Sequence, residues 1–388
     1  MPGGLRFFGN LANAREKVKE RPLTSHATYL ARRYFPAIDG LRALSVLPVV
    51  FHHATPRPLP GALGRGPLGV DLFFAISGFL ITTLLLREAR SDGRISLSAF
   101  YARRAFRIFP AYYVVALLHV AFAFVAPPDV RAHFFANLPF FLTYTTNWFV
   151  DFGVPHAVLF SYAWSLAAEE QFYGFWPSLM KLVVARASKL HAVLFGAMVL
   201  LLSFDALVES GLLFSGAGLL TRIASSFPAP IGFGVLFAIA LDDERTHVVI
   251  APILSHPVSR GVILAACVAA FAVGIPIPAA FLAFAALVAM LALRDDSWSS
   301  RALSTAPLRF VGTLSYAIYL THVAALGVVR RSFPEHRENA FFVFGAGLPL
   351  VLGLAALLHY AIERPWLRRG RRPPVPKSAA SSKEAMQP

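Results

Sequence analysis

The residues best suited to chemistry lie in one apolar stretch, Ile38 to His53, which contains Asp39, Arg42, His52 and His53. An ionised side chain near the middle of a membrane helix costs about 2.5–3.5 kcal/mol on insertion scales, so such residues indicate functional sites. At about 100° per residue, the helix returns almost to the same face between Arg42 and His53, roughly 16 Å along its axis, whereas His52 points about 80° away. We therefore favour Arg42 and His53 as a functional pair; snorkelling of Arg42, with the histidines at the opposite interface, is the alternative.

A carboxylate, Asp71, lies near the start of the next apolar stretch, Gly69 to Ile81. If the first helix runs outward and the second returns, Asp71 and His53 lie at similar depth. A carboxylate beside an imidazole fixes its tautomer and raises its basicity, which suits a general base acting on a hydroxyl. The alternative role of Asp71 is a simple N-terminal helix cap.

Two arginines, Arg104 and Arg107, are three residues apart at the mouth of the third apolar stretch. This spacing puts them on neighbouring faces of one helical turn, where two guanidinium groups can bind phosphates bidentately. The chain contains neither the Gly-x-x-x-x-Gly-Lys loop of nucleoside-triphosphate-binding proteins nor the Gly-x-Gly-x-x-Gly loop that follows a strand in dinucleotide-binding proteins. The arginine pair therefore does not indicate either of these folds. A charged flank that only sets membrane topology is the alternative.

A third cluster of polar residues follows Trp164, where Glu169, Glu170, Gln171 and Tyr173 occur at the start of an apolar stretch. The aromatic residues alone would indicate an interfacial belt. The acids either complement the dipole at the helix N-terminus or bind acceptor hydroxyls and assist proton transfer.

Late in the chain, Ser315 to His322 places another histidine within an apolar span. A lone intramembrane histidine is more often a hydrogen-bonding member of the helix bundle than a catalyst.

Composition indicates a polytopic membrane protein: of 388 residues, 56% are hydrophobic and 15% are charged. The formal charge of +15 does not indicate nucleic-acid binding, because the basic residues cluster between apolar spans and at both ends. The single cysteine, Cys267, excludes an internal disulfide framework or redox pair. Neither His-Glu-x-x-His nor a Cys/His cluster occurs, so no metal site is expected.

The apolar runs predict an all-α bundle of about ten transmembrane helices. The expected spans are 36–54, 67–86, 110–127, 164–184, 190–208, 225–241, 258–275, 277–293, 310–329 and 340–361. An eleventh run, 134–150, is interrupted by polar residues and Pro139, and is better interpreted as re-entrant or interfacial. Ten spans place both basic termini in the cytoplasm, whereas eleven would place one outside. Pro276 and Pro278 predict a tight hairpin between two of the spans.

We divide the chain into a basic cytoplasmic segment (1–35), one membrane domain (36–366) and a disordered Pro-rich, basic cytoplasmic tail (367–388).

Taken in order, these blocks resemble the acyltransferase 3 family of integral membrane O-acyltransferases. The resemblance spans residues 38 to 366. It rests on Asp39-Gly40-Leu41-Arg42 followed ten residues later by His53, Gly69 to Ile81, Arg103 to Arg107, Trp164 to Tyr173, Ser315 to His322, and Ile362-Glu363-Arg364-Pro365. Each block is weakly specific, but the ordered set is strongly specific.

The resemblance implies transfer of an acyl group, usually acetyl, from cytoplasmic acyl-coenzyme A to a hydroxyl, often on a sugar at the outer face of the bacterial inner membrane. It implies catalytic roles for His53, Asp71 and Glu169, with His53 as the base. Binding of acyl-coenzyme A is assigned to Arg42, Arg104 and Arg107. Binding of a carbohydrate or glycolipid acceptor is assigned to Trp164, Gln171, Tyr173 and His322.

Some members of the family append a soluble esterase-like domain. About 25 polar residues follow Arg364 here, so we expect that domain to be absent and the membrane unit to perform transfer. The competing hypothesis is a transporter or flippase whose intramembrane charges line a path. A third hypothesis is a non-catalytic membrane scaffold. The sequence does not distinguish among a lipopolysaccharide sugar, an exopolysaccharide, a glycolipid and a small glycosylated metabolite as acceptor.

Overall fold

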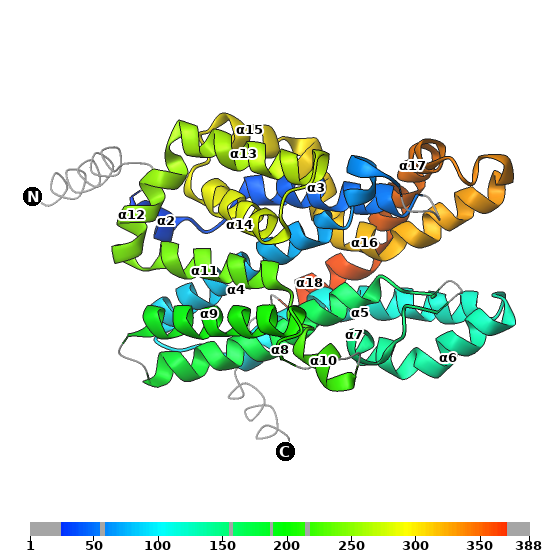
Figure 1. Cartoon of the computed structure of the whole chain (residues 1–388), viewed down its shortest axis with the longest axis horizontal. Coiled ribbons are helices and arrows are strands. Elements are labelled where there is room, and N and C mark those ends of the chain that lie inside the picture. The colour runs from blue at the N-terminus through cyan, green and yellow to red at the C-terminus, as the bar shows by residue number, and fades with distance from the viewer. Residues whose placement is uncertain (1–24, 55–58, 155–157, 187–188, 214–217, 371–388) are drawn as a thin grey trace, which may run out of the picture.

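The computed structural model describes residues 25–54, 59–154, 158–186, 189–213 and 218–370, and every regular element in these ranges is helical (Figure 1). The first 24 residues and the tail after Gly370 lie outside them, so most of the predicted N-terminal segment and tail is not described. The helices are α2 (His26–Ala31), α3 (Pro36–His52), α4 (Leu68–Asp92), α5 (Leu97–Ala123), α6 (Pro128–Leu142), α7 (Thr146–Phe149), α8 (Ala163–Arg186), α9 (Leu190–Glu209), α10 (Leu219–Ala224), α11 (Ala229–Asp242), α12 (Glu244–Ser255), α13 (Pro257–Ala272), α14 (Ile277–Leu293), α15 (Trp298–Leu303), α16 (Ala306–Ser332), α17 (Ala340–Leu358) and α18 (Arg364–Gly370), with a π-helical turn, His359–Glu363, before α18.

Six helical segments of the described chain are long and apolar enough to cross a membrane: Gly61–Asp92, Leu97–Ala123, Leu190–Glu209, Leu219–Asp242, Ala306–Ser332 and Ala340–Gly370. The pair α12 and α13, bent by 75°, is a seventh if it counts as one broken span. The polytopic all-α class is therefore confirmed, while the count of ten stays a prediction. Three further predicted spans correspond to α3, α8 and α14. Of these, α3 and α14 have only 17 residues each, and α8 carries charged residues along its length.

The interrupted run 134–150 divides into α6, which has 15 residues, and the single turn α7. Between them the backbone of Tyr144 has φ of 55°, in the left-handed region that ends a helix. The break agrees with the prediction that this run is no ordinary span.

Local sequence explains where the site-bearing helices begin and end. Pro36 lies in the first turn of α3, where its missing N–H costs no hydrogen bond. Ser96 caps α5 by accepting a hydrogen bond from the amide of Ala99. The helix therefore begins well before the predicted span at 110, and Pro110 lies within it without ending it. Arg104 and Arg107 are consequently carried on the same continuous helix as the third span.

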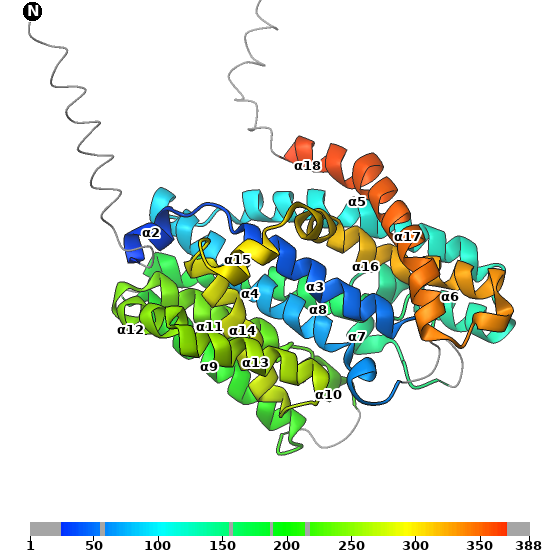
Figure 2. The same cartoon turned by 90° about the horizontal axis from the view of Figure 1, so that it is seen from above.

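The helices α3 and α4 lie in the middle of the molecule (Figure 1). On one side, α4 packs on α11 and α14, and α13 packs on α14 as the predicted hairpin. On the other side, α3 packs on α16, which packs on α17. Figure 2 shows the first and last described helices, α2 and α18, along the same edge of the molecule. The central position of α3 and α4 places their polar residues between two apolar clusters.

The contact between α4 and α11 depends on two glycines. A Cβ added to Gly78 would lie 2.1 Å from the carbonyl oxygen of Ile231, and one added to Gly234 would lie 2.2 Å from that of Ala75. Small residues let membrane helices approach this closely. We expect Gly78→Ala and Gly234→Ala each to lower stability by about 1–3 kcal/mol through overpacking, measured by thermal unfolding in detergent. The matched control is Gly261→Ala in α13, because a Cβ added there would have no neighbouring atom of another element within 4 Å. Equal stability of the three variants would contradict the prediction.

Candidate functional site

The three arginines predicted to act together line one cavity, which we call the arginine cavity. It has a volume of about 730 Å³, part of it open to solvent, between α3, α4, α5, α8 and α16. Its polar lining residues are Arg42, Ser77, Arg104, Arg107, Glu169, Glu170, Tyr173 and Tyr316. The structure thus brings together guanidinium groups from α3 and α5, which the sequence places more than sixty positions apart.

Aromatic rings hold two of these guanidinium groups in place. The Arg104 guanidinium lies 5.6 Å from the ring centre of Phe100 and 5.4 Å from that of Tyr173. That of Arg42 lies 5.9 Å from the ring centre of Phe73. No ion pair within the described residues involves Arg42, Arg104 or Arg107. Glu169 and Glu170 line the same cavity, so three guanidinium groups share it with two carboxylates, and the excess of positive charge favours an anionic ligand.

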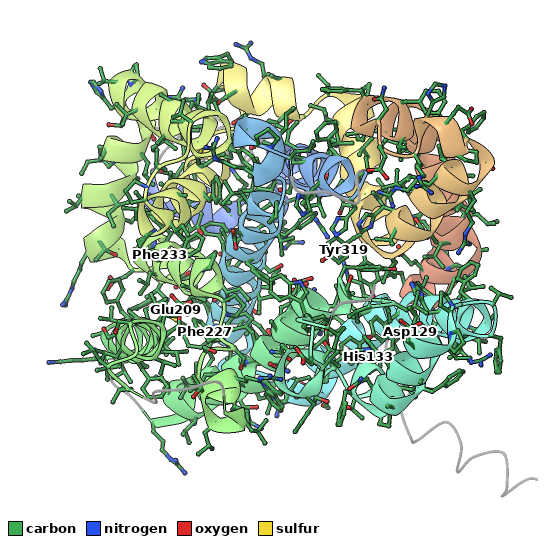
Figure 3. All side chains as sticks on the ribbon, turned by 45° about the vertical axis from the view of Figure 1, so that its right-hand side comes forward. Asp129, His133, Glu209, Phe227, Phe233 and Tyr319 are labelled. Atoms are coloured by element: carbon green, nitrogen blue, oxygen red, sulfur yellow. The ribbon has the colours of Figure 1, made fainter. Side chains whose placement is uncertain are left out.

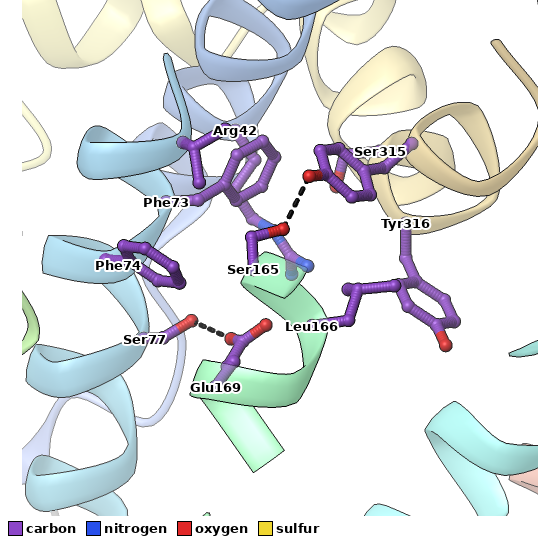
Figure 4. Close-up of a pocket in the computed structure, with 11 residues that line it drawn as sticks. Arg42, Phe73, Phe74, Ser77, Ser165, Leu166, Glu169, Ser315 and Tyr316 are labelled. Atoms are coloured by element: carbon purple, nitrogen blue, oxygen red, sulfur yellow. Dashed lines mark hydrogen bonds between the residues drawn. The ribbon is translucent and has the colours of Figure 1, made fainter. Parts of the chain in front are cut away.

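A second cavity, the middle cavity, adjoins the arginine cavity and has a volume of about 450 Å³, part of it open to solvent (Figure 4). The two cavities share Arg42, Ser77 and Glu169 among their lining residues. One carboxylate oxygen of Glu169 accepts hydrogen bonds from the hydroxyls of Ser77 and Tyr173. In Figure 4 the Arg42 side chain extends between Ser165 and Glu169. Glu169 therefore occupies a fixed position at the junction of the two cavities.

A third cavity, the histidine cavity, contains His53 and has a volume of about 670 Å³, part of it open to solvent. Val70 and Tyr319 line both this cavity and the middle cavity, so the three cavities form a row. Arg42 and His53 both line this row, as their spacing predicts. His52 lines the histidine cavity as well, although the spacing directs it about 80° away. Figure 3 places Tyr319 near the centre of the molecule.

Hydrogen bonds to backbone carbonyls fix the ring nitrogens of two histidines. Nδ1 of His322 lies 2.7 Å from the carbonyl oxygen of Tyr319, and Nδ1 of His53 lies 2.9 Å from that of Val49. A carbonyl oxygen only accepts, so each Nδ1 carries a hydrogen. Nε2 of a neutral His322 is then an acceptor, and it lies 3.3 Å from Nδ1 of His53. In neutral His53 this arrangement leaves Nε2 as the unprotonated nitrogen.

Asp71 does not have the predicted position beside the His53 ring. No hydrogen bond or ion pair in the described chain joins the two residues, and His322, not Asp71, contacts the imidazole. Asp71 instead lines a fourth cavity, together with Trp164, which also lines the histidine cavity. Similar depth along two helices does not set the direction of their side chains, so the pairing inferred from depth is corrected.

The residues assigned to acceptor binding have separate positions. The amide of Gln171 is paired with that of Asn147 through two hydrogen bonds of 2.8 and 3.0 Å, and it also donates to the carbonyl of Tyr144. Gln171 therefore positions α7. Tyr173 lines the arginine cavity, and His322 is fully buried behind His53. Of the four, only Trp164 lines the histidine cavity.

Several residues of the site were not singled out from the sequence. The hydroxyls of Ser165 and Tyr319 lie 2.5 Å apart beside the middle cavity, and Tyr162 donates to the carbonyl of Leu320. The available signal was helical spacing, because Tyr319 precedes His322 by one turn. In the described part of the chain, no group of three or more His, Cys, Asp or Glu residues is arranged to hold a metal ion.

Comparison with known sequences agrees with this geometry. Residues 35–360 match the acyltransferase 3 family, which is described as an acyltransferase domain. The chain belongs to this family. The match covers all helices that line the three cavities, and it confirms the resemblance drawn from the ordered motifs.

Members of the acyltransferase 3 family with similar sequences occur in several bacteria. The peptidoglycan O-acetyltransferase OatA of Listeria monocytogenes is 29% identical over 325 residues, which cover 76% of this chain and 50% of that protein. A protein of Staphylococcus aureus, provisionally named as an O-acetyltransferase, is 27% identical over 371 residues, covering 88% and 59%. The protein YrhL of Bacillus subtilis, provisionally named as a peptidoglycan O-acetyltransferase, is 28% identical over 364 residues, covering 88% and 56%. The chain thus spans between half and three-fifths of these relatives. No solved structure matches the chain.

Proposed function

We propose that this chain is a membrane-embedded O-acyltransferase of the bacterial cytoplasmic membrane. It moves an acyl group, acetyl in our assignment, from acyl-coenzyme A to a hydroxyl of a cell-envelope carbohydrate. The observation that carries the proposal is the row of cavities that leads from Arg42, Arg104 and Arg107 to His53. Two of the relatives are named as O-acetyltransferases, and these names support the choice of acetyl as the acyl group and of a hydroxyl as the acceptor.

The arginine cavity suits the donor. Coenzyme A carries several phosphate charges, and guanidinium groups without an ion-pair partner bind phosphate bidentately. The middle cavity then accommodates the arm that carries the thioester, with Arg42 and Glu169 where it meets the arginine cavity. The thioester carbonyl thereby approaches the histidine cavity from the side opposite to the acceptor.

The reaction at His53 is a proton transfer coupled to acyl transfer. Nε2 of His53 takes the proton of the acceptor hydroxyl as the oxygen attacks the thioester carbonyl carbon. The new carbon–oxygen bond forms, the carbon–sulfur bond breaks, and coenzyme A leaves as a thiolate. The protonated imidazole returns its proton to the thiolate, which restores neutral His53 for the next turnover.

Radiolabelled acetyl-coenzyme A supplied to membranes that contain the wild type or His53→Ala tests the proposal. We expect label on an envelope glycan with the wild type only. Extraction and analysis of the labelled material would then identify the acceptor class. Movement of a glycan precursor across the membrane, without consumption of acetyl-coenzyme A, would instead support the transporter hypothesis.

Arg107 provides a test of the donor site, because it lines the arginine cavity without stacking on a ring. Loss of one charge-assisted hydrogen bond to phosphate is expected to raise KM for acetyl-coenzyme A at least about tenfold in Arg107→Met, with a smaller change in kcat. The matched control is Arg103→Met on the same helix, since Arg103 is exposed and pairs with Glu88. An equal KM in both variants would contradict the assignment.

A further inference from the structure

A fourth cavity, which we call the carboxylate cavity, lies on the other side of Trp164 from His53. It has a volume of about 750 Å³, part of it open to solvent, and is lined by segments from α4, α7, α8, α9, α10, α11 and α14 and by the turn before α11. Its charged lining residues are Asp71, Glu209 and Arg222, and its aromatic ones are Phe74, Trp164, Phe227 and Phe281. Glu209 and Phe227 lie close together in Figure 3. None of the residues assigned to donor binding lines this cavity.

The carboxylate cavity adjoins the proposed reaction centre. Trp164 lines both it and the histidine cavity, and Phe74 lines both it and the middle cavity. The rings of Phe74 and Trp164 pack edge to face with centres 6.3 Å apart, so they lie together at the border of the carboxylate cavity with the other two cavities. Asp71 lies in the first turn of α4, whereas Ser77 of the arginine cavity lies almost two turns further along. The carboxylate cavity and the arginine cavity therefore lie at different levels of the same helix.

The charged groups of this cavity have no partner among the described residues. Asp71, Glu209 and Arg222 make no hydrogen bond or ion pair there through their side chains, although all three line one space; Glu209 is exposed and the other two are half-buried, so all three are open to water or to a ligand. Two carboxylates only accept hydrogen bonds, and a guanidinium only donates them. A ligand that suits both must donate and accept at neighbouring positions, which is the property of a ring bearing several hydroxyls. An anion would be repelled by the two carboxylates, and a cation would leave Arg222 unpaired.

We propose that the carboxylate cavity binds the sugar ring of the acceptor. Asp71 and Glu209 accept hydrogen bonds from its hydroxyls, Arg222 donates one, and the ring lies beside Trp164, the residue that lines both cavities, so that one hydroxyl reaches past the indole to Nε2 of His53. This inference rests on the proposed function and deepens it. It also gives Asp71 a role that its position supports, as an acceptor-binding residue instead of a partner of His53.

The experiment separates donor use from acceptor use. The probe is the oligosaccharide fraction released from the glycan that the wild type labels with radioactive acetyl-coenzyme A. For each variant, the KM for this oligosaccharide, the KM for acetyl-coenzyme A and the slow hydrolysis of the thioester without oligosaccharide are measured. Failure of the wild type to label any glycan would refute the proposed function itself, and would be seen before any variant is compared.

In Glu209→Gln and Arg222→Met, we expect KM for the oligosaccharide to rise about tenfold, because each loses a charge-assisted hydrogen bond to the ring. KM for acetyl-coenzyme A and thioester hydrolysis are expected to stay at wild-type values. Glu335→Gln and Arg331→Met, the same changes at exposed positions outside the cavities, are the matched controls. An unchanged KM for the oligosaccharide, or an equal rise in both KM values, would overturn the proposal.

Discussion

A His53→Gln variant is expected to transfer acyl groups about 10²–10⁴-fold more slowly than the wild type, because it lacks the general base that takes the acceptor proton. Glutamine keeps a hydrogen-bonding group of similar length but does not titrate as imidazole does. The loss should appear in kcat, with KM for acetyl-coenzyme A nearly unchanged, since the phosphate-binding arginines line a different cavity. The measurement is initial-rate kinetics with radiolabelled acetyl-coenzyme A in reconstituted membranes.

The matched control for His53→Gln is His336→Gln, the same substitution at a histidine exposed in the turn between α16 and α17. That variant should keep wild-type rates. A folded, membrane-inserted His53→Gln protein with wild-type kcat would refute the assignment of His53 as the base. The neighbouring His52→Gln change is expected to have a smaller effect, because no hydrogen bond of the described chain fixes the His52 ring.

The parts of the site that sequence analysis predicted correctly depend on spacing within one helix. Arg42 and His53 lie along the same row of cavities because eleven residues nearly complete three helical turns. Arg104 and Arg107 line one cavity because three residues nearly complete a single turn. Helical periodicity was sufficient for the two arginines, but it did not separate His53 from His52, which lines the same cavity.

The parts that were missed depend on contacts between helices that are far apart in the sequence. His53 and His322 come together through the packing of α3 on α16, and no periodicity connects these two positions. Ser77 donates to Glu169 across the contact of α4 with α8 for the same reason. Pairing of Asp71 with His53 was predicted from depth, but rotation of α4 about its axis determines where Asp71 points.

The limits of the span prediction have a similar physical origin. Hydropathy identified the apolar runs, and six of them are helical segments long and apolar enough to cross a membrane. Two of the remaining runs, α3 and α14, form helices of only 17 residues, and α8 carries charged residues along its length, among them Glu169 and Glu170 of the arginine cavity. In α8, the residues that build the site therefore reduce the apolar character on which the span prediction depends.

His322 is expected to act as a positioning residue, and His322→Leu should lower kcat about tenfold, the effect of losing one hydrogen bond. The single Nδ1 hydrogen of His53 is shared between the carbonyl oxygen of Val49, at 2.9 Å, and Nε2 of His322, at 3.3 Å, and this leaves Nε2 of His53 free to take the acceptor proton. Leucine fills the space but offers no acceptor, so His53 keeps only the contact with Val49. KM for acetyl-coenzyme A should not change.

Two conservative variants distinguish this role from simple packing. The side-chain amide of His322→Gln reaches the position of Nε2 and offers a carbonyl oxygen there, whereas that of His322→Asn reaches only the position of Nδ1. We therefore expect His322→Gln to recover much of the lost kcat and His322→Asn to resemble His322→Leu. A packing role would instead favour leucine, the most apolar of the three, because His322 is fully buried. If kcat is highest in His322→Leu, the proposed control of the His53 tautomer is refuted. If kcat is higher in His322→Gln than in His322→Asn and His322→Leu, the proposal is supported.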